Sequence, residues 1–406
     1  MTINLSEDQI KGIIKDYIDD NTTDYAIMIN GKWGSGKTFF IKNKVVNELE
    51  AECEQENKQK VKFIYISVYG INETKTVDGR IYDELVNEFL RIGEVPTKVK
   101  KVIESVYKIA GTFKKLPKIP MESIRNLIAQ LQKLDSYVFI FDDIERCEMP
   151  ISELMGYIND FVEHKKVKAI IIANEDEILR KNLNENAELK YLVAESELLN
   201  IPKEENYFNK IMETKENNES KLDIKEIDRR VEMIFGEDRK YKLIKEKLIK
   251  NTIQYIPNLD EVINEIIKVC VKNNSVKETI EANKRRIVNI MENKGHINIR
   301  TLKTAISIMS KVLEIVQKVD LSTYDENEIK SCKDKIMDYT MYACINYKDG
   351  KWHDEDAPEI FSIVNEKMVN ESTEGFKFID EIIEKSYFDE ERIKTVVLSY
   401  MKVQPF

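Results

Sequence analysis

The octapeptide Gly31–Thr38 constrains the fold of this chain more than any other feature. It reads G-K-W-G-S-G-K-T, the complete pattern of the phosphate-binding Walker A loop. The apolar run Tyr25–Asn30 precedes it and predicts a buried strand, and the segment that starts at Phe39 predicts a helix. A strand, a glycine-rich loop and a helix in this order predict an α/β core with a parallel sheet that binds a nucleotide.

The residue types in the loop suit phosphate chemistry. We expect Gly31, Gly34 and Gly36 to adopt positive φ and to bring backbone N–H groups close to phosphate oxygens. The Lys37 ammonium would reach the β- and γ-phosphates, and the Thr38 hydroxyl would ligate Mg²⁺. The sequence therefore predicts one nucleotide-binding set, which comprises Gly31, Lys32, Trp33, Gly34, Ser35, Gly36, Lys37 and Thr38.

A second apolar strand ends in carboxylates at Tyr137–Cys147. Asp142 follows the apolar residues at the carboxyl end of this strand, where open α/β sheets bind their ligands. We therefore expect Asp142 to be the Walker B residue and to hold Mg²⁺. Asp143 lies where many P-loop ATPases carry a glutamate that orients the attacking water, and Glu145 could share that role.

The next apolar strand, Val167–Ala173, ends at Asn174. Asn174 is either a sensor that hydrogen-bonds the attacking water or a γ-phosphate oxygen, or an ordinary turn residue. Another strand is predicted at Lys62–Tyr69, between the two Walker segments, which argues against the simple GTPase arrangement. Because the chain also lacks the guanine-reading N-K-x-D tetrapeptide, ATP is the expected nucleotide.

Four segments resemble the KAP family of P-loop NTPases. They are W-G-S-G-K-T at Trp33–Thr38, D-D-I-E-R-C at Asp142–Cys147, Y-F-N-K-I at Tyr207–Ile211 and N-I-R-T-L-K at Asn298–Lys303. The resemblance implies a core with sheet order 5-1-4-3-2, a helical lid, and ATP hydrolysis or ATP-gated switching. It also implies a role in bacterial anti-phage defence or in membrane-associated signalling.

The chain departs from many KAP proteins between the Walker segments. Many members carry transmembrane helices there, whereas the apolar runs of this chain are far shorter than the ~18 residues that span a bilayer. The corresponding region, Lys98–Pro120, predicts a lysine-rich amphipathic helix. Its Lys98–Lys118 stretch could contact a membrane surface, a nucleic acid or a partner, or could simply be a solvated helix face.

Composition limits the cellular setting. The five cysteines show no C-x-x-C spacing, so we expect free thiols and a cytoplasmic protein. The net charge of −10 disfavours a dedicated DNA-wrapping role. At the N-terminus, Ser6 and Gln9 predict a helix-capping box and not a signal peptide.

The order of patterns along the chain predicts three domains. Residues 1–212 would form the NTPase core, 222–318 a helical lid and 322–406 a C-terminal helical domain, and the polar stretch 213–221 would separate core from lid. We expect residues 222–406 to be all-helical.

Three arginines could contribute to the nucleotide-binding site. Arg300, in the predicted lid, is the candidate that would reach the γ-phosphate when lid and core close. Arg146 and Arg180 could act on a neighbouring subunit, and all three could instead form surface ion pairs.

These patterns predict a Mg²⁺-dependent ATPase that couples nucleotide state to conformational change or oligomerisation. It would act as a homo-oligomer, through a separate effector protein, or both. One alternative is a scaffold that holds ATP as a switch with little turnover. Another is a nucleic-acid-handling ATPase, for which the basic run Lys284–Arg286 could contact the phosphate backbone.

Overall fold

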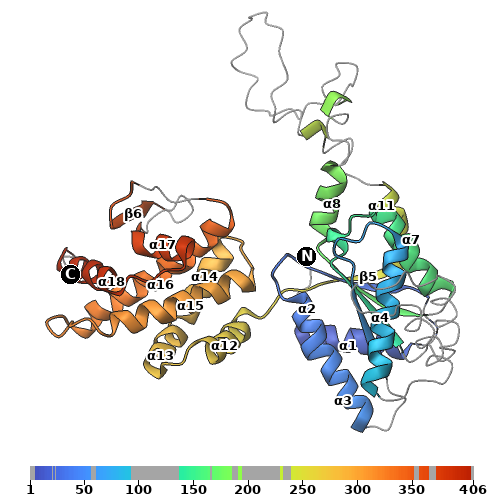
Figure 1. The fold of residues 1–406 in the computed structure, drawn as a ribbon, viewed down its shortest axis with the longest axis horizontal. Helices are drawn as coiled ribbons and strands as arrows, with labels where there is room; N and C mark the ends of the chain where they lie inside the picture. The colour runs from blue at the N-terminus through green and yellow to red at the C-terminus, as the bar shows by residue number, and fades with distance from the viewer. Residues whose placement is uncertain are drawn as a thin grey trace, which may run out of the picture. The chain divides into compact units, whose positions relative to one another are not determined.

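The computed structural model describes residues 5–20, 22, 24–55, 61–92, 137–164, 167–184, 191–193, 229–231, 239–351, 356–364 and 372–403. The chain forms two compact units, drawn in Figure 1. The first comprises Met1–Gly31 and Lys37–Tyr255, and the second comprises Lys32–Gly36 and Ile256–Phe406.

The first unit contains a five-stranded parallel sheet. Its strands are β1 (Ala26–Asn30), β2 (Lys62–Ser67), β3 (Tyr137–Asp142), β4 (Lys168–Ala173) and β5 (Ile249–Gln254). They lie in the order β2-β3-β4-β1-β5, and every pairing is parallel. Read from the other edge, this is the expected 5-1-4-3-2 order, so the predicted fold class is confirmed.

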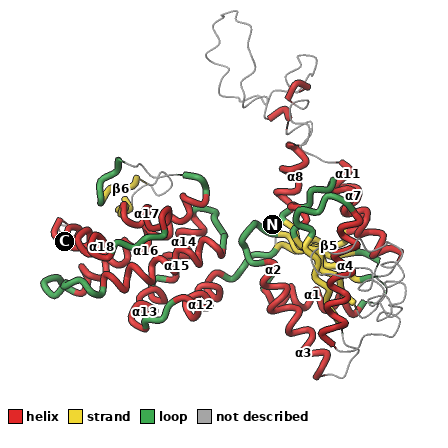
Figure 2. Tube along the Cα trace, in the orientation of Figure 1, coloured by secondary structure: helices red, strands yellow, loops and turns green. Residues whose placement is uncertain are grey.

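Helices cover both faces of this sheet, which Figure 2 shows in yellow among red helices. Every residue of β3 and β4 is buried, as central strands between two helical layers require. One face packs on α1 (Glu7–Asp19), the π-helical η1 (Phe40–Val46) and α3 (Asn47–Gln55), and the short α2 (Lys37–Phe39) leads into η1. The other packs on α4 (Thr74–Ile92), α7 (Ile151–Asn159), α8 (Glu175–Asn184) and α11 (Arg239–Leu248).

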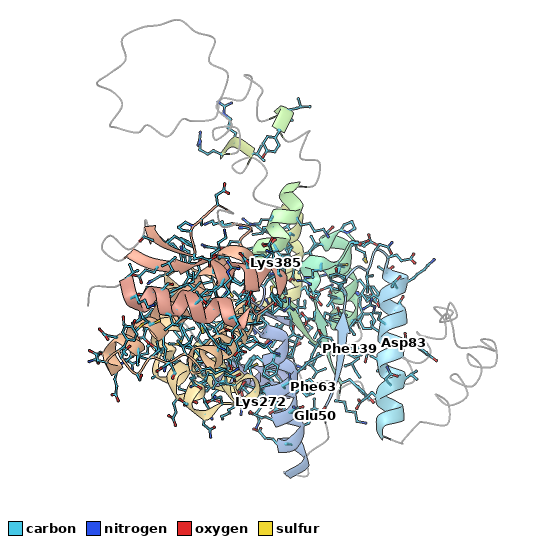
Figure 3. All side chains as sticks on the ribbon, turned by 60° about the vertical axis from the view of Figure 1, so that its left-hand side comes forward. Glu50, Phe63, Asp83, Phe139, Lys272 and Lys385 are labelled. Atoms are coloured by element: carbon cyan, nitrogen blue, oxygen red, sulfur yellow. The ribbon has the colours of Figure 1, made fainter. Side chains whose placement is uncertain are left out.

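Two details show how the sequence builds these layers. The Phe139 ring, labelled on the sheet in Figure 3, lies 6.2 Å from the Phe161 ring in η4 (Asp160–His164), centroid to centroid. Helix α1 begins with the predicted capping box: the Gln9 N–H donates to Ser6 Oγ at 3.2 Å, and the Ser6 N–H donates to Gln9 Oε1 at 2.9 Å. These bonds satisfy donors that a helix start otherwise leaves unpaired.

The second unit is mainly helical around one core. Its helices are α12 (Leu259–Cys270), α13 (Asn274–Ala282), α14 (Lys284–Asn293), α15 (Ile299–Val316), α16 (Glu326–Lys348), α17 (Lys377–Lys385) and α18 (Glu390–Val403). Asn298 caps α15 by accepting from the Arg300 N–H at 3.0 Å. Loop residues 32–36 group with this unit, where the Ile299 N–H donates to the Gly34 carbonyl at 2.7 Å.

The expectation that residues 222–406 are all-helical is wrong in three segments. Strand β5 lies within this range and belongs to the sheet, and β6 (Ile360–Val364) pairs with β7 (Ser372–Phe376) as an antiparallel hairpin. β5 is an edge strand whose central residues are exposed and polar, so it lacks the apolar run that identifies a buried strand. β6 is rich in β-branched and aromatic residues, which favour strands.

Several predicted features are not tested by the described part of the chain. The basic segment Lys98–Pro120, the Tyr207–Ile211 motif and the polar boundary 213–221 lie outside the described residues. The three domain ranges stay predictions, although residues before 318 and after 322 share one hydrophobic core. Of the helices that the structure describes, none has the length and apolar character to cross a bilayer.

Candidate functional site

The Walker A loop follows β1 and leads into α2. Gly34 has φ 76° and Gly36 has φ 90°, a region that favours glycine, whereas Gly31 does not have the expected positive φ. The Gly31 N–H instead donates to the Ala173 carbonyl at the end of β4 at 3.2 Å. The two turned glycines give the loop the backbone shape of an anion-binding nest.

Two buried polar side chains belong to this loop. Ser35 is 2% exposed, and its Oγ has no hydrogen-bond partner among the described residues. A buried hydroxyl without a partner is costly, so an acceptor such as a phosphate oxygen would suit it. Lys37 is 8% exposed, and its ammonium donates to the Gly31 carbonyl. Lys32 and Trp33 are exposed, so they can border a ligand without being part of the buried cradle.

Burial and nearby charges act oppositely on Lys37. Burial lowers the pKa of its ammonium below the usual value, while the carboxylates of Glu145, Asp142 and Asp143 raise it, with Glu145 having the largest of the three effects. The net pKa is lowered, so the folded protein disfavours the charged form. An anionic ligand beside this ammonium would offset that cost.

Thr38 and Asp142 meet directly beyond the loop. The Thr38 hydroxyl donates to Asp142 Oδ2 at 2.6 Å, and Asp142 is 4% exposed. The Tyr65 hydroxyl donates to the same oxygen at 2.6 Å, and the Asp143 N–H donates to Oδ1 at 2.7 Å. A hydroxyl and a carboxylate this close are hard oxygen donors that could share one Mg²⁺.

Asp143 has its own contacts at this edge of the sheet. Its φ of 62° is left-handed, a region that Asp tolerates better than most residues. The Ser67 hydroxyl donates to its Oδ2 at 3.0 Å, and Arg146 Nε lies 3.8 Å from its Oδ1. The Asp143 carboxylate is therefore already engaged by β2 and by the short helix η3 (Ile144–Arg146).

Glu145 and Asn174 lie together at the end of β4. The Asn174 N–H donates to Glu145 Oε2 at 3.1 Å, and Asn174 is 5% exposed. Beside them, Asn30 Oδ1 accepts from the Glu175 N–H at 2.9 Å, and Asn30 Nδ2 donates to Gln254 Oε1 at 3.0 Å. Polar groups from β4, β1 and β5 are thus joined at the carboxyl edge of the sheet.

The structure separates the three arginine candidates. Arg146 pairs with Asp143 and lies 5.6 Å from the Tyr69 ring centroid within the same chain. Arg180 is an exposed surface residue bonded to Glu177 at 3.0 Å. Arg300 is exposed in the first turn of α15, in the second unit. The first two have partners in their own subunit, which gives them a simpler explanation than action on a neighbour.

The sequence patterns did not identify four residues at the carboxyl edge of the sheet. Tyr65 and Ser67 are two apart on β2, so they point to the same face, and Ser67 pairs in register with Asp142. Asn30 and Gln254 are likewise register partners at the ends of β1 and β5. A polar residue at the last position of each strand was the signal that could have identified three of them.

One solved structure has a weak likeness to this chain. The crystal structure of Cdc6p from Pyrobaculum aerophilum is similar over 98% of this chain and 93% of that chain, with 11% identity and a TM-score of 0.35. A likeness this weak carries no conclusion about fold or function. No curated protein matches the chain.

The family comparison is more informative. The KAP family P-loop domain matches residues 8–214, about half of the chain. This range includes the Walker A loop, all of strands β1 to β4 and the carboxylates at the end of β3. The chain therefore belongs to the KAP family of P-loop NTPases.

Proposed function

We propose that this protein is a Mg²⁺-dependent ATPase. The observation that carries the proposal is the 2.6 Å bond between the Thr38 hydroxyl and the buried Asp142 carboxylate, immediately after the phosphate-binding loop. Thr38 and Asp142 would hold the metal, and the loop with Lys37 would hold the β- and γ-phosphates. ATP is favoured over GTP because the chain lacks the guanine-reading tetrapeptide.

The residues of the site would have separate roles in hydrolysis. Bound Mg²⁺ would neutralise charge on the phosphates. Glu145 is the better candidate to accept a proton from the attacking water, because its Oε2 lies 3.1 Å from the Asn174 nitrogen at the carboxyl edge of the sheet. Asp143 would instead position the end of β3 through Ser67 and Arg146. Asn174 would sense the γ-phosphate, and Arg300 would report its presence to the helical unit.

A direct test combines a metal titration with a change at Tyr65. Wild-type protein should release phosphate from ATP only when Mg²⁺ is present. Tyr65→Phe removes the hydroxyl that orients the Asp142 carboxylate, so the Mg²⁺ concentration for half-maximal hydrolysis should rise about tenfold. The measurement is phosphate release at saturating ATP across a range of Mg²⁺.

The control for this change is Tyr69→Phe. Tyr69 follows the same strand but is 56% exposed. Removing its hydroxyl should leave the Mg²⁺ requirement unchanged. An unaltered requirement in Tyr65→Phe would contradict the metal role of Asp142. Tight ATP binding with no phosphate release in the wild type would favour the scaffold alternative.

We infer that ATP binding drives oligomerisation or the action of a separate effector, and that the protein acts in anti-phage defence, as the family resemblance implies. The cysteine spacing favours a cytoplasmic setting. Wild-type protein should change its assembly size on adding ATP and should lower phage plating in a host that carries its genomic neighbours. Lys37→Met should lose both effects. Plating that is equal for the two proteins would contradict the defence role.

The nucleic-acid alternative has weaker support. Two members of the basic run Lys284–Arg286 already face acidic side chains: Arg286 bonds Asp338, and Lys284 Nζ lies 3.4 Å from Asp260. Paired cations attract a phosphate backbone less strongly than unpaired ones. Stimulation of ATP hydrolysis by DNA, with a steep salt dependence, would revive this alternative.

A further inference from the structure

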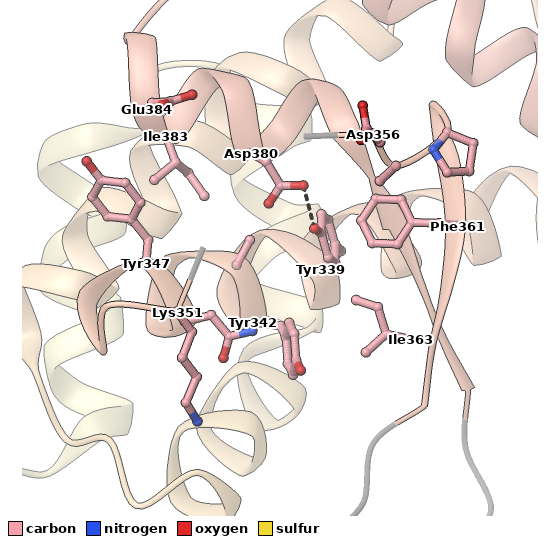
Figure 4. Close-up of a pocket in the computed structure, with 14 residues that line it drawn as sticks. Tyr339, Tyr342, Tyr347, Lys351, Asp356, Phe361, Ile363, Asp380, Ile383 and Glu384 are labelled. Atoms are coloured by element: carbon pink, nitrogen blue, oxygen red, sulfur yellow. Dashed lines mark hydrogen bonds between the residues drawn. The ribbon is translucent and has the colours of Figure 1, made fainter. Parts of the chain in front are cut away.

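The second unit contains a cavity of about 420 Å³ that is separate from the nucleotide-binding residues. It lies among α16, the segment 356–358, β6 and α17. Figure 4 shows Asp380 and Tyr339 near its centre and Phe361 beside them. Its volume falls within the range of roughly 300–1,000 Å³ that is typical of small-ligand sites.

A buried carboxylate forms part of its wall. Asp380 is 7% exposed, and its Oδ2 accepts from the Tyr339 hydroxyl at 2.6 Å. Burial, followed by the charge of Asp380, raises the pKa of the Tyr339 hydroxyl, so Tyr339 stays a neutral donor. A buried carboxylate attracts cations, so this wall favours a positively charged ligand.

The remaining charged side chains of the lining are mostly negative. Asp356 and Glu384 add two carboxylates, and Lys351 supplies the single ammonium of the described lining. Among the described residues, no three acidic, histidine or cysteine side chains are grouped so that they could hold a metal ion. The negative lining therefore suits an organic cation better than a bare metal.

Aromatic rings form much of the rest of the wall. Tyr339, Tyr342, Tyr347 and Phe361 all line the cavity. The Tyr339 and Phe361 rings meet edge to face at 5.7 Å, and Lys294 Nζ lies 4.4 Å from the Tyr342 ring centroid. The latter contact shows that one of these rings already accepts a cation. Aromatic faces combined with carboxylates are the usual means of binding guanidinium and alkylammonium groups.

The β6–β7 hairpin holds one of these rings in place. Phe361 pairs in register with Gly375, and a Cβ at Gly375 would lie 2.3 Å from the Phe361 ring. Glycine is therefore needed where the ring crosses the partner strand. The hairpin is built to place an aromatic wall on this side of the cavity.

We propose that this cavity binds an organic cation, with a guanidinium or alkylammonium group held among the tyrosine rings and facing Asp380, Asp356 and Glu384. The ligand is either a small free amine or an arginine or lysine side chain of a partner. Both sources share this chemistry, and the ligand series below separates them.

Isothermal titration calorimetry on the full chain provides the test. The ligands are free agmatine, the peptide acetyl-Gly-Arg-Gly-amide, and the same peptide with uncharged citrulline in place of arginine. We expect agmatine or the arginine peptide to bind and the citrulline peptide not to bind. Tighter binding of agmatine indicates a free amine, whereas tighter binding of the peptide indicates a side chain. Binding should weaken as salt is added.

Two exposed positions test the site without disturbing its core. Glu384→Gln and Tyr347→Ala should each weaken binding about threefold, because they remove a rim charge and a ring face. Asp380→Asn should weaken it at least about tenfold. The control is Glu391→Gln, whose side chain is 85% exposed on α18 and does not line the cavity.

Three outcomes would overturn the proposal. They are no binding of agmatine or of the arginine peptide at millimolar concentration, equal binding of the citrulline peptide, or unchanged affinity in both Glu384→Gln and Tyr347→Ala. None of these depends on ATP hydrolysis, so the result stands apart from the proposed ATPase activity.

Discussion

Lys37→Met should weaken ATP binding at least ~100-fold, about 3 kcal/mol, while leaving the folded protein no less stable than the wild type. Methionine keeps the apolar length of the lysine stem and removes its charge. The binding loss follows because the ammonium is the buried cation of the Walker A loop and would pair with phosphate oxygens.

The stability side of this prediction comes from the sign of the pKa shift. Burial lowers the pKa of Lys37 despite three nearby carboxylates, so the folded state binds that proton less strongly than the unfolded state does. The shift therefore costs stability at every pH below the ordinary lysine pKa of 10.5, neutral pH included. A neutral side chain removes that cost, and the free energy of unfolding without nucleotide should stay level or rise.

Calorimetry with ATP and urea unfolding without it provide the two measurements. The matched control is Lys277→Met, which makes the same chemical change at a half-buried surface position of α13 and should alter neither. Retained ATP binding in Lys37→Met would contradict the phosphate role of this loop. Lost binding together with a marked fall in stability would instead point to misfolding.

Local sequence patterns were enough to predict that the Walker A loop and the carboxylate at the end of β3 lie close together. The glycine positions and the apolar strand before them predict the loop, and the carboxylate at the end of a buried strand predicts that Asp142 comes near it. The 2.6 Å contact between Thr38 and Asp142 agrees with that expectation. Their roles as metal ligands stay predictions until the titration is done.

Other features depended on contacts that no local pattern encodes. Tyr65 reaches Asp142 because β2 and β3 are neighbours in the sheet, although 77 residues separate the two side chains along the chain. β5 was not predicted because its polar central residues interrupt the apolar run that identifies a buried strand. The cavity of the second unit is assembled from α16, β6 and α17, so its carboxylates and rings become a cluster only once these elements pack.

Glu145→Gln should lower the turnover number for ATP by roughly 10²–10³-fold while ATP still binds. Glutamine keeps the length of the side chain, and its amide oxygen can still accept the Asn174 N–H that Glu145 Oε2 accepts at 3.1 Å. It cannot take a proton from water at neutral pH. Binding and catalysis should therefore separate in this variant, which would accumulate the ATP-bound state.

Asp143→Asn is the matched comparison, since it removes a carboxylate only two residues away. The Asp143 side chain is engaged by Ser67 and lies near Arg146, so we expect a fall in turnover of less than about tenfold. Single-turnover phosphate release with prebound ATP would measure both variants directly. A larger loss in Asp143→Asn than in Glu145→Gln would assign the proton acceptor to Asp143. Full turnover in both would mean that neither carboxylate is the base, because a neutral amide cannot replace a proton acceptor without a large change in rate.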